Sequence, residues 1–298
     1  MTDGIILLDK PPGQTSFQSL GIIKRRLGTR KVGHAGTLDM FAEGLLVVLA
    51  GRMTRLCAFA TSLDKEYIAS ITFGRETDTL DPEGTVIAEG PVPSAPDLLA
   101  FLPKMVGDSM QVPPAFSALH VGGRRAYEAA RAGETVALAP RPIRITAIDL
   151  LGYEPPTARI RVSCSKGTYI RSLARDIAAG LGTRGYVSTL RRTRVGGFAA
   201  VDACKPADCD PSRHLLPAHR FFDAAPGFLR ATLRADAVRR VANGFPVTGD
   251  SFQALPGEDG LFAALTPEGE LAAVMERHGE LLRYVAVLKD ARPAGAPR

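Results

Sequence analysis

A single aspartate, Asp39, stands among small, turn-forming residues near the start of the chain. Residues 33–39 read GHAGTLD, and an apolar run follows at residues 44–49. Glycines in such a loop accept backbone dihedrals closed to other residues and let a bulky ligand approach closely. An acid held there by a strand behind it can be offered to a substrate. The alternative is an Asx turn, in which the carboxylate bonds its own backbone, and the local residues leave both interpretations open.

The composition is that of a globular protein with one large domain or two. The chain has 298 residues, 45% hydrophobic and 23% charged, which is ordinary for such proteins. Charges or prolines interrupt every apolar run before it reaches the length that spans a bilayer. The first four residues, MTDG, lack the basic region of a signal peptide. We therefore expect a cytoplasmic protein with no membrane partner.

The charge balance indicates a polyanionic partner. The formal net charge is +6 and the isoelectric point is about 9.3. Basic residues gather within residues 24–31, 124–131 and 184–194. Together these clusters could follow a phosphate backbone, although each one alone could be a solvated face.

Four potential zinc ligands follow one another at equal spacing: Cys204, Cys209, His214 and His219. Structural zinc sites usually hold each ligand pair close and separate the pairs by a longer loop. Here the gap between the pairs is no longer than the gap within them, and three prolines stiffen the stretch. The sequence therefore predicts no metal site. The other two cysteines are expected to be core thiols without disulfides: Cys57 and Cys164.

Hydrophobic periodicity predicts an α+β protein. We expect strands at 5–8, 45–49, 67–73, 143–151, 158–164 and 186–194, with a hairpin turn at 81–84. Helices are expected at 16–27, 54–61, 94–101 and 168–179. Thr15 or Ser16 can cap the first helix, Gly28 can end it, and Thr168 can cap the last one.

The pattern changes toward the C-terminus. A Pro- and Asp-rich segment, residues 205–212, interrupts the periodicity. After residues 225–227 (APG) we expect a helix near 235–242 and short strands around 261–265, 271–275 and 284–287. We therefore predict a first domain at 1–225, a small β-rich domain at 226–290 and a disordered tail at 291–298.

Short motifs occur in a fixed order along the chain: LDKPPGQTS at 8–16, GHAGTLD at 33–39, KEY at 65–67, PAFSAL at 114–119, RPI at 141–143, SKGTYIR at 165–171 and LRR at 190–192. Together they resemble the bacterial tRNA pseudouridine synthases of the TruB type, strongly over residues 4–200 and more loosely beyond. Several ordered motifs are more specific than any single short pattern. One position departs, because Met40 stands where the family usually has proline, but this change removes no chemical group.

The resemblance implies that uridine is isomerised to pseudouridine at position 55 in the T-loop of tRNA. It implies no cofactor and no metal, and we expect a monomer without an obligate protein partner. The implied fold is a mixed, mainly antiparallel sheet flanked by helices. A small, β-rich, RNA-binding C-terminal domain of PUA type is expected to follow.

The implied reaction breaks an N-glycosidic bond, turns the uracil and joins it to the sugar through carbon. A carboxylate can stabilise or attack the sugar carbon, attack the uracil ring or remove a sugar proton, and the sequence leaves these roles open. Each role needs an ionised carboxylate, for which Asp39 is the candidate. Burial alone would keep an aspartate protonated. The resemblance implies that Arg171 supplies the neighbouring cation.

The same resemblance assigns other residues around the target base. Tyr67 is expected to stack on the uracil, a contact worth about 1–3 kcal/mol, and its hydroxyl to take part in proton transfer. Tyr169 and Leu190 are expected to wall the pocket. A uridine in a folded T-loop must be flipped out, and His34 is expected to fill the space it leaves. Lys10 is expected to support the catalytic loop and contact phosphate. Without the resemblance, Tyr67 and Leu190 would be interpreted as core residues.

An insertion at about residues 105–142 resembles a family segment that closes over RNA. Within it, residues 122–131 begin with a glycine pair and are expected to become a basic helix. Arg124, Arg125 and Arg131 are expected to contact the RNA backbone, with an affinity that falls as salt rises.

Two other functions share parts of this pattern. A tRNA-binding or folding factor without catalysis would also need basic patches, but pure binding does not need a carboxylate facing phosphates. An RNA-guided synthase would share the catalytic motif. The long segment between residues 73 and 141 favours the stand-alone bacterial type.

Overall fold

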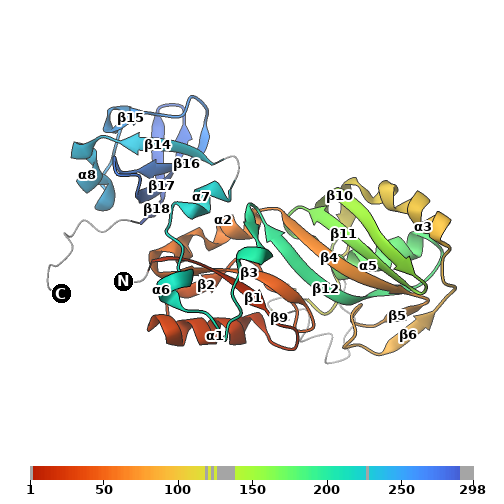
Figure 1. Cartoon of the computed structure of the whole chain (residues 1–298). Helices are drawn as coiled ribbons and strands as arrows, with labels where there is room; N and C mark the ends of the chain where they lie inside the picture. The colour runs from red at the N-terminus through yellow and green to blue at the C-terminus, as the bar shows by residue number, and fades with distance from the viewer. Residues whose placement is uncertain (1–2, 118–119, 122–123, 126–137, 226–227, 289–298) are drawn as a thin grey trace.

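Figure 1 shows the fold, a computed structural model that describes residues 3–117, 120–121, 124–125, 138–225 and 228–288. A long mixed sheet forms the larger part, and a second, smaller sheet follows near the C-terminus. Among the helices in these ranges, none is both long and apolar enough to cross a membrane. The predicted α+β class with a mixed, mainly antiparallel sheet is confirmed.

The central sheet has a path of seven strands, in the order β1 (Gly4–Lys10), β3 (Glu43–Ala50), β12 (Gly185–Val195), β4 (Lys65–Phe73), β11 (Thr157–Cys164), β10 (Arg141–Glu154) and β7 (Gly107–Gln111). Two short strands extend it at the side, namely β2 (Val32–His34) on β3 and β13 (Phe198–Ala199) on β12. Every pair is antiparallel except β3 with β12. The central strand, β4, pairs with β12, which comes from a distant part of the chain.

Strand β4 shows why this sheet carries a site. Its residues alternate between buried and half-buried along the whole strand, as expected where successive side chains point to opposite faces. The buried face includes Tyr67 and continues into an apolar cluster with Ile71 and Phe73. The site is therefore built on a rigid, central strand.

Helices cover the sheet: α1 (Ser16–Leu27), η1 (Gly51–Leu56), α2 (Cys57–Ser62), α3 (Ala95–Phe101), η2 (Leu102–Met105) and α5 (Ile170–Gly180). Helix α1 begins with a capping box between Thr15 and Gln18 and ends at Gly28, whose φ of 60° glycine adopts without strain. Phe17, in its first turn, is 76% exposed. Helix α5 buries most of its length against β4 and β12.

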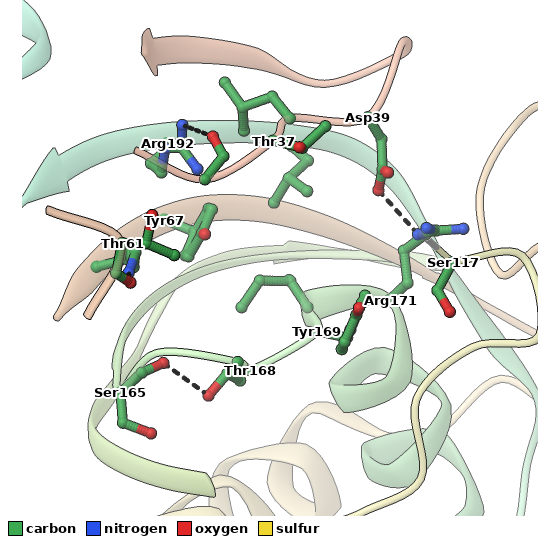
Figure 2. Close-up of a pocket in the computed structure, with 16 residues that line it drawn as sticks. Thr37, Asp39, Thr61, Tyr67, Ser117, Ser165, Thr168, Tyr169, Arg171 and Arg192 are labelled. Carbon is green, nitrogen blue, oxygen red and sulfur yellow. Dashed lines mark hydrogen bonds and ion pairs between the residues drawn. The ribbon is translucent and has the colours of Figure 1, made fainter. Parts of the chain in front are cut away.

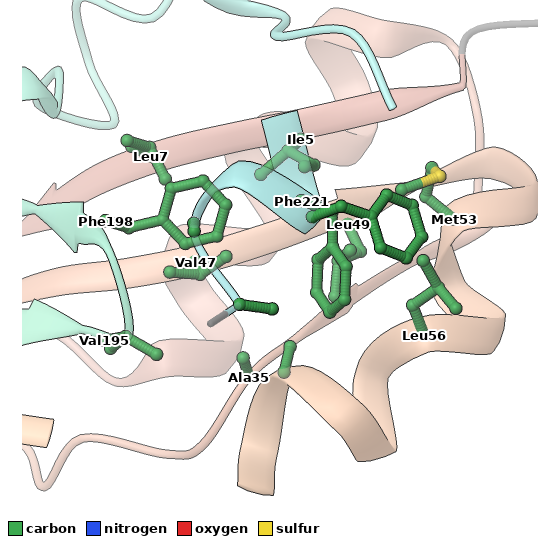
Figure 3. Close-up of a cluster of buried hydrophobic side chains, with 14 of the residues drawn as sticks. Ile5, Leu7, Ala35, Val47, Leu49, Met53, Leu56, Val195, Phe198 and Phe221 are labelled. Atoms are coloured by element: carbon green, nitrogen blue, oxygen red, sulfur yellow. The ribbon is translucent and has the colours of Figure 1, made fainter. Parts of the chain in front are cut away.

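A second apolar cluster joins the N-terminal strands to the end of the chain (Figure 3). Ile5 and Leu49 pack there with Phe221, which belongs to α7 (Arg220–Asp223). The cluster also contains Val274 and Ala286 of the second sheet. Apolar packing therefore connects the two sheets.

Two hairpins project from the central sheet. Strands β5 (Arg75–Thr77) and β6 (Val86–Glu89) flank the predicted turn at residues 81–84. Strands β8 (His120–Val121) and β9 (Arg124–Arg125) form the other hairpin. The helix expected over 122–131 is therefore wrong at residues 124–125. The rest of that segment, including Arg131, lies outside the described residues.

The second sheet has the order β15 (Phe252–Ala254), β14 (Leu229–Leu233), β16 (Gly260–Leu265), β17 (Leu271–His278) and β18 (Leu281–Val287). A 3-10 turn, η4 (Ala235–Ala237), leads into α8 (Val238–Ala242) beside it. Its core contains Phe252 and Phe262, whose rings meet edge to face at 5.6 Å. The predicted β-rich unit is confirmed. The predicted domain boundary, between residues 225 and 226, falls between the last strand of the first sheet and the first strand of the second. The boundary itself remains a prediction.

Candidate active site

A cavity of about 290 Å³ opens where the loop at residues 36–39 meets β4, β12 and the start of α5 (Figure 2). Five of the residues predicted for the site line it: Asp39, Tyr67, Tyr169, Arg171 and Leu190. They come from four separate parts of the chain, so the fold gathers them. Lys10 and His34 are not among the lining residues that the structure describes.

Asp39 and Arg171 form an ion pair at the mouth of this cavity. Arg171 Nε lies 2.9 Å from Asp39 Oδ2. The arginine side chain is 5% exposed, whereas 40% of the aspartate side chain faces the open cavity. Burial raises the pKa of the Asp39 carboxyl, and the Arg171 cation opposes that rise. The guanidinium is therefore the main group that favours a charged carboxylate here, and the Lys10 cation adds a smaller effect.

A second, buried carboxylate also pairs with Arg171. Asp81 Oδ2 accepts a hydrogen bond from Arg171 Nη1 at 3.0 Å, and the Asp81 side chain is 5% exposed. Two further guanidinium contacts go to the backbone carbonyls of Thr79 and Phe116, both at 2.9 Å. A planar guanidinium offers donors in a fixed fork, so these contacts leave Arg171 one orientation.

The loop that carries Asp81 is itself tightly held. Asp81 Oδ1 accepts from the Thr79 hydroxyl at 2.6 Å and from the Glu83 backbone N–H at 3.0 Å. Leu80 has φ of 62°, a left-handed conformation that non-glycine residues rarely adopt. Such strain persists only where surrounding contacts enforce it. The loop therefore presents Asp81 to Arg171 at some local cost.

The N-terminal strand and helix fix the loop that carries Asp39. Lys10 is fully buried, and its Nζ donates to the carbonyls of Pro11, Gln14 and Met40. Burial lowers the pKa of Lys10 to about 8. Ser16 Oγ accepts from the Leu38 N–H at 3.0 Å and donates to the Leu38 carbonyl at 3.1 Å. Contacts to both neighbours of Asp39 thus restrict its backbone.

Tyr67 and Arg192 face each other across the centre of the sheet. They are register partners on β4 and β12. Arg192 is 1% exposed and donates to the carbonyls of Leu45 at 2.7 Å and Gly36 at 3.1 Å. Burial raises the pKa of the Tyr67 hydroxyl, and the Arg192 cation opposes the rise. The phenol therefore stays protonated near neutral pH.

Residues 24–170, which contain six of the nine strands that the structure describes in the larger sheet, match the model of the TruB family pseudouridylate synthases, N-terminal domain. tRNA pseudouridine synthase B of Mycobacterium tuberculosis is 39% identical over 296 residues, covering 97% of this chain and 96% of that relative. This chain belongs to the TruB family. tRNA pseudouridine synthase B of Borreliella burgdorferi is 45% identical over 206 residues, covering 68% of this chain and 73% of that relative.

Solved structures share the fold of this TruB-family chain. An H/ACA RNP bound to a substrate RNA containing 2'-deoxyuridine gives a TM-score of 0.73 at 24% identity, over 98% of this chain and 86% of the other. An archaeal box H/ACA sRNP Nop10–Cbf5 complex gives 0.72 at 24% identity, over 99% and 88%. The likeness extends across both sheets, so the pseudouridine synthase fold and a following PUA-like sheet are confirmed at the level of fold.

Two features of this TruB-family site were not found from sequence. Asp81 was interpreted as a turn residue, because DPEG is a good turn by itself. Arg192 was counted in a basic cluster that follows phosphate, and this is wrong for a side chain that is 1% exposed. The neighbouring Arg191 is also engaged, with Asp9 at 3.0 Å and Glu43 at 3.2 Å. The strand alternation of β12, which turns Arg192 inward, is the signal that could have identified it.

Other predicted residues that the structure describes lie on the short strands β2 and β9. His34 is half-buried on β2, and its pKa is lowered by burial and then by the Arg192 cation, so the ring is neutral near pH 7. Arg124 and Arg125 lie on β9. A local prediction was also wrong, because Tyr169 rather than Thr168 is the N-cap of α5 and provides no side-chain cap. Thr168 Oγ1 instead donates to the Ser165 carbonyl at 3.0 Å.

Proposed function

We propose that this chain isomerises uridine to pseudouridine in the T-loop of tRNA, at position 55. The observation that carries the proposal is the Asp39–Arg171 ion pair at the mouth of a cavity walled by Tyr67. Membership of the TruB family and the names of its tRNA-modifying relatives support the substrate class.

The reaction balances without a co-reactant. The bond from N1 of uracil to C1′ of the ribose breaks, a bond from C5 to C1′ forms, C5 loses a proton and N1 gains one. A glycosidic carbon that loses its base develops positive charge, which a carboxylate can stabilise or attack. Attack on the ring and removal of a sugar proton remain alternative roles of Asp39. All of them need the charged form that Arg171 favours.

The cavity fits one detached base. Its volume of about 290 Å³ is enough for a pyrimidine ring with part of its ribose, but not for a stacked helix. The target nucleotide must therefore be turned out of the T-loop before it reaches Asp39. Tyr67 and Leu190 both line the cavity, and the ring of Tyr67 offers a flat surface on which the uracil can rest while it turns.

We further propose where the rest of the tRNA binds. His34 lies outside the cavity and would fill the gap that the everted base leaves in the T-loop. The hairpin with Arg124 and Arg125 would contact the backbone, together with Arg131 of the same insertion. The C-terminal sheet would act as an RNA-binding unit of PUA type, and the protein would work as a monomer without a protein partner.

The decisive experiment incubates the purified full chain with an unmodified tRNA transcript, without guide RNA or added cofactor, and maps nucleosides along the T-loop. Pseudouridine at position 55 supports the proposal. A protein that binds the transcript tightly but leaves uridine at 55 is instead a binding or folding factor. Modification that requires an added guide RNA identifies an RNA-guided synthase. A transcript with cytidine at position 55 is the matched substrate control.

A further inference from the structure

Three residues outside the active site bring zinc-binding chemistry together. The two Sγ atoms of Cys204 and Cys209 and one ring nitrogen of His214 all lie within 4.8 Å of one another. We propose that these residues bind one Zn²⁺ ion. The equal spacing argues against a zinc site along the sequence, but a turn between the two cysteines, in which the Asp208 N–H donates to the Lys205 carbonyl, brings them together in space. His219 is not part of the group.

The donor set suits this metal. Two thiolates and one imidazole form a common zinc coordination, with distances of about 2.3 Å to sulfur and 2.0–2.1 Å to nitrogen. Tetrahedral ligands at those distances lie roughly 3.3–3.8 Å from one another, so the observed group needs only a small contraction. Cys204 and His214 are half-buried, which leaves room for a water molecule as the fourth ligand.

The backbone around the group is anchored on several sides. The Cys204 N–H donates to the Leu7 carbonyl at 3.0 Å, and the Cys204 carbonyl accepts from the Asp9 N–H at 2.9 Å. Cys209 is fully buried in the cluster beneath α1. Arg26 donates to the carbonyls of Cys209 and Ala207. The thiols are therefore held in place by strand β1 and helix α1.

The histidine has the support that metal-binding imidazoles usually have. His214 ends the short helix α6 (Pro211–His214), and its Nδ1 lies 2.9 Å from both the N–H and the carbonyl of Asp210. With the proton on Nδ1, the ring donates to the Asp210 carbonyl, and this contact fixes the ring and leaves Nε2 for a metal. Asp210 is itself held, because its side chain accepts from the Ser212 N–H at 2.9 Å.

The thiols would change their charge on binding. Cysteine binds zinc as a thiolate, so both thiols release their protons when Zn²⁺ binds. A bound ion would fasten the segment between the central sheet and α7 to β1. The inference is independent of the proposed activity, since none of the three residues lines the active-site cavity.

The test uses the full chain, reduced, stripped of metal with a chelator and titrated with Co²⁺ as a coloured substitute for Zn²⁺. We expect a thiolate-to-cobalt absorption band that saturates at one ion per chain and disappears when Zn²⁺ is added. In Cys209→Ser the band should be lost, with affinity weakened by at least about 100-fold, more than the 10–100-fold typical of outer-sphere changes. Cys57→Ser and His219→Gln are matched controls that should retain it.

Three outcomes overturn the proposal. The first is a wild-type chain that shows no cobalt–thiolate band at equimolar metal, while circular dichroism reports a folded protein. The second is a band that persists in the Cys204→Ser/Cys209→Ser double variant. A Cys204–Cys209 disulfide that forms in the presence of Zn²⁺, seen by peptide mass as the loss of two hydrogens, also contradicts it. If Cys209→Ser does not fold, His214→Gln should weaken cobalt binding in a chain with both thiols intact.

Discussion

The two sheets of this protein treat buried charge in opposite ways. Among the residues that the structure describes, every buried charged side chain belongs to the larger sheet and its loops: Lys10, Lys65, Asp81, Arg171 and Arg192. The second sheet buries Phe252, Phe262 and other apolar residues, with Thr266 as its buried polar side chain. Both are well-packed, so packing alone does not require the charges.

The difference shows which part of the fold accepts the energetic cost of burying charged groups near the candidate site. A buried ion costs several kcal/mol unless partners compensate it. Arg171 meets two carboxylates and two carbonyls, and Lys10 meets three carbonyls. These groups surround the one carboxylate that opens to the cavity. The charged half should therefore control turnover, and the apolar half should control stability and RNA contact.

The largest effect is expected for Asp39→Asn. The amide keeps the shape but cannot carry the charge that every proposed role requires. Turnover on the tRNA transcript should fall by on the order of 10³-fold or more, within the range for loss of a group that acts directly on the substrate. The dissociation constant for tRNA, measured by filter binding, should stay within a few-fold. A variant that still turns over normally would remove Asp39 from the chemistry.

Arg171→Ala should come next. It leaves Asp39 and the buried Asp81 without their cation, and breaking such a pair costs about 3–5 kcal/mol of stability. Because Arg171 lowers the pKa of Asp39, its loss raises that pKa. The acid limb of the kcat profile should therefore move to higher pH, with a large drop in kcat at neutral pH.

Arg175→Ala is the control for Arg171→Ala, since Arg175 lies one turn further along α5 and pairs with Asp176 at 2.8 Å. It should leave the pH profile in place. An unchanged rate at saturating tRNA in Arg171→Ala would show that Arg171 does not assist the reaction.

Asp81→Asn is a further test, because its expected effect on the pH profile is opposite in sign to that of Arg171→Ala. The Asp81 charge raises the pKa of Asp39, so removing it should shift the acid limb of kcat to lower pH. The amide still accepts from Arg171, so kcat should fall only about tenfold, the equivalent of one weakened hydrogen bond to a charged group. Asp78→Asn in the same loop is the control, since its carboxylate accepts from the Thr85 N–H instead. A shift to higher pH would mean that Asp81 acts only through the fold.

The sequence predicted most elements because each carries a local signal. Strand β4 alternates, helix α1 has its cap and terminal glycine, and the aspartate motif lies in a glycine-rich loop. The predicted helix cap at Thr168 was wrong by one residue, because Tyr169 is the N-cap. The Thr168 hydroxyl instead donates to the Ser165 carbonyl. Local patterns therefore located the elements and several of the cavity-lining residues.

What could not be predicted depends on contacts between distant segments. Arg191 and Arg192 are identical neighbours in sequence, yet one pairs with Asp9 and the other is buried beside Tyr67. Alternation along β12 turns one of them inward, and the pairing of β12 with β4 places that side chain beside Tyr67. Asp81 likewise acquires its role from Arg171, which lies 90 positions further along the chain.

A smaller effect is expected from the second sheet if it contacts RNA. Arg234 and Arg239 are exposed beside and on α8. Replacing both by alanine should raise KM for tRNA a few-fold at low salt and flatten its salt dependence, since each lost phosphate contact reduces the slope by about one. The value of kcat should not change. A KM and a salt dependence that both match the wild type would mean that this face of the second sheet does not bind the tRNA.

The smallest effect on chemistry, and a large one on stability, is expected for Phe262→Ala. Phe262 is fully buried against Phe252 in the core of the second sheet. Removing the ring leaves a cavity and should lower the free energy of unfolding of that sheet by about 3–5 kcal/mol. Well below the new melting temperature, the pH dependence of kcat should match the wild type, because no charge near Asp39 has changed. A displaced acid limb in this variant would mean that the two sheets are coupled through the apolar cluster around Phe221, and that the division of roles between them fails.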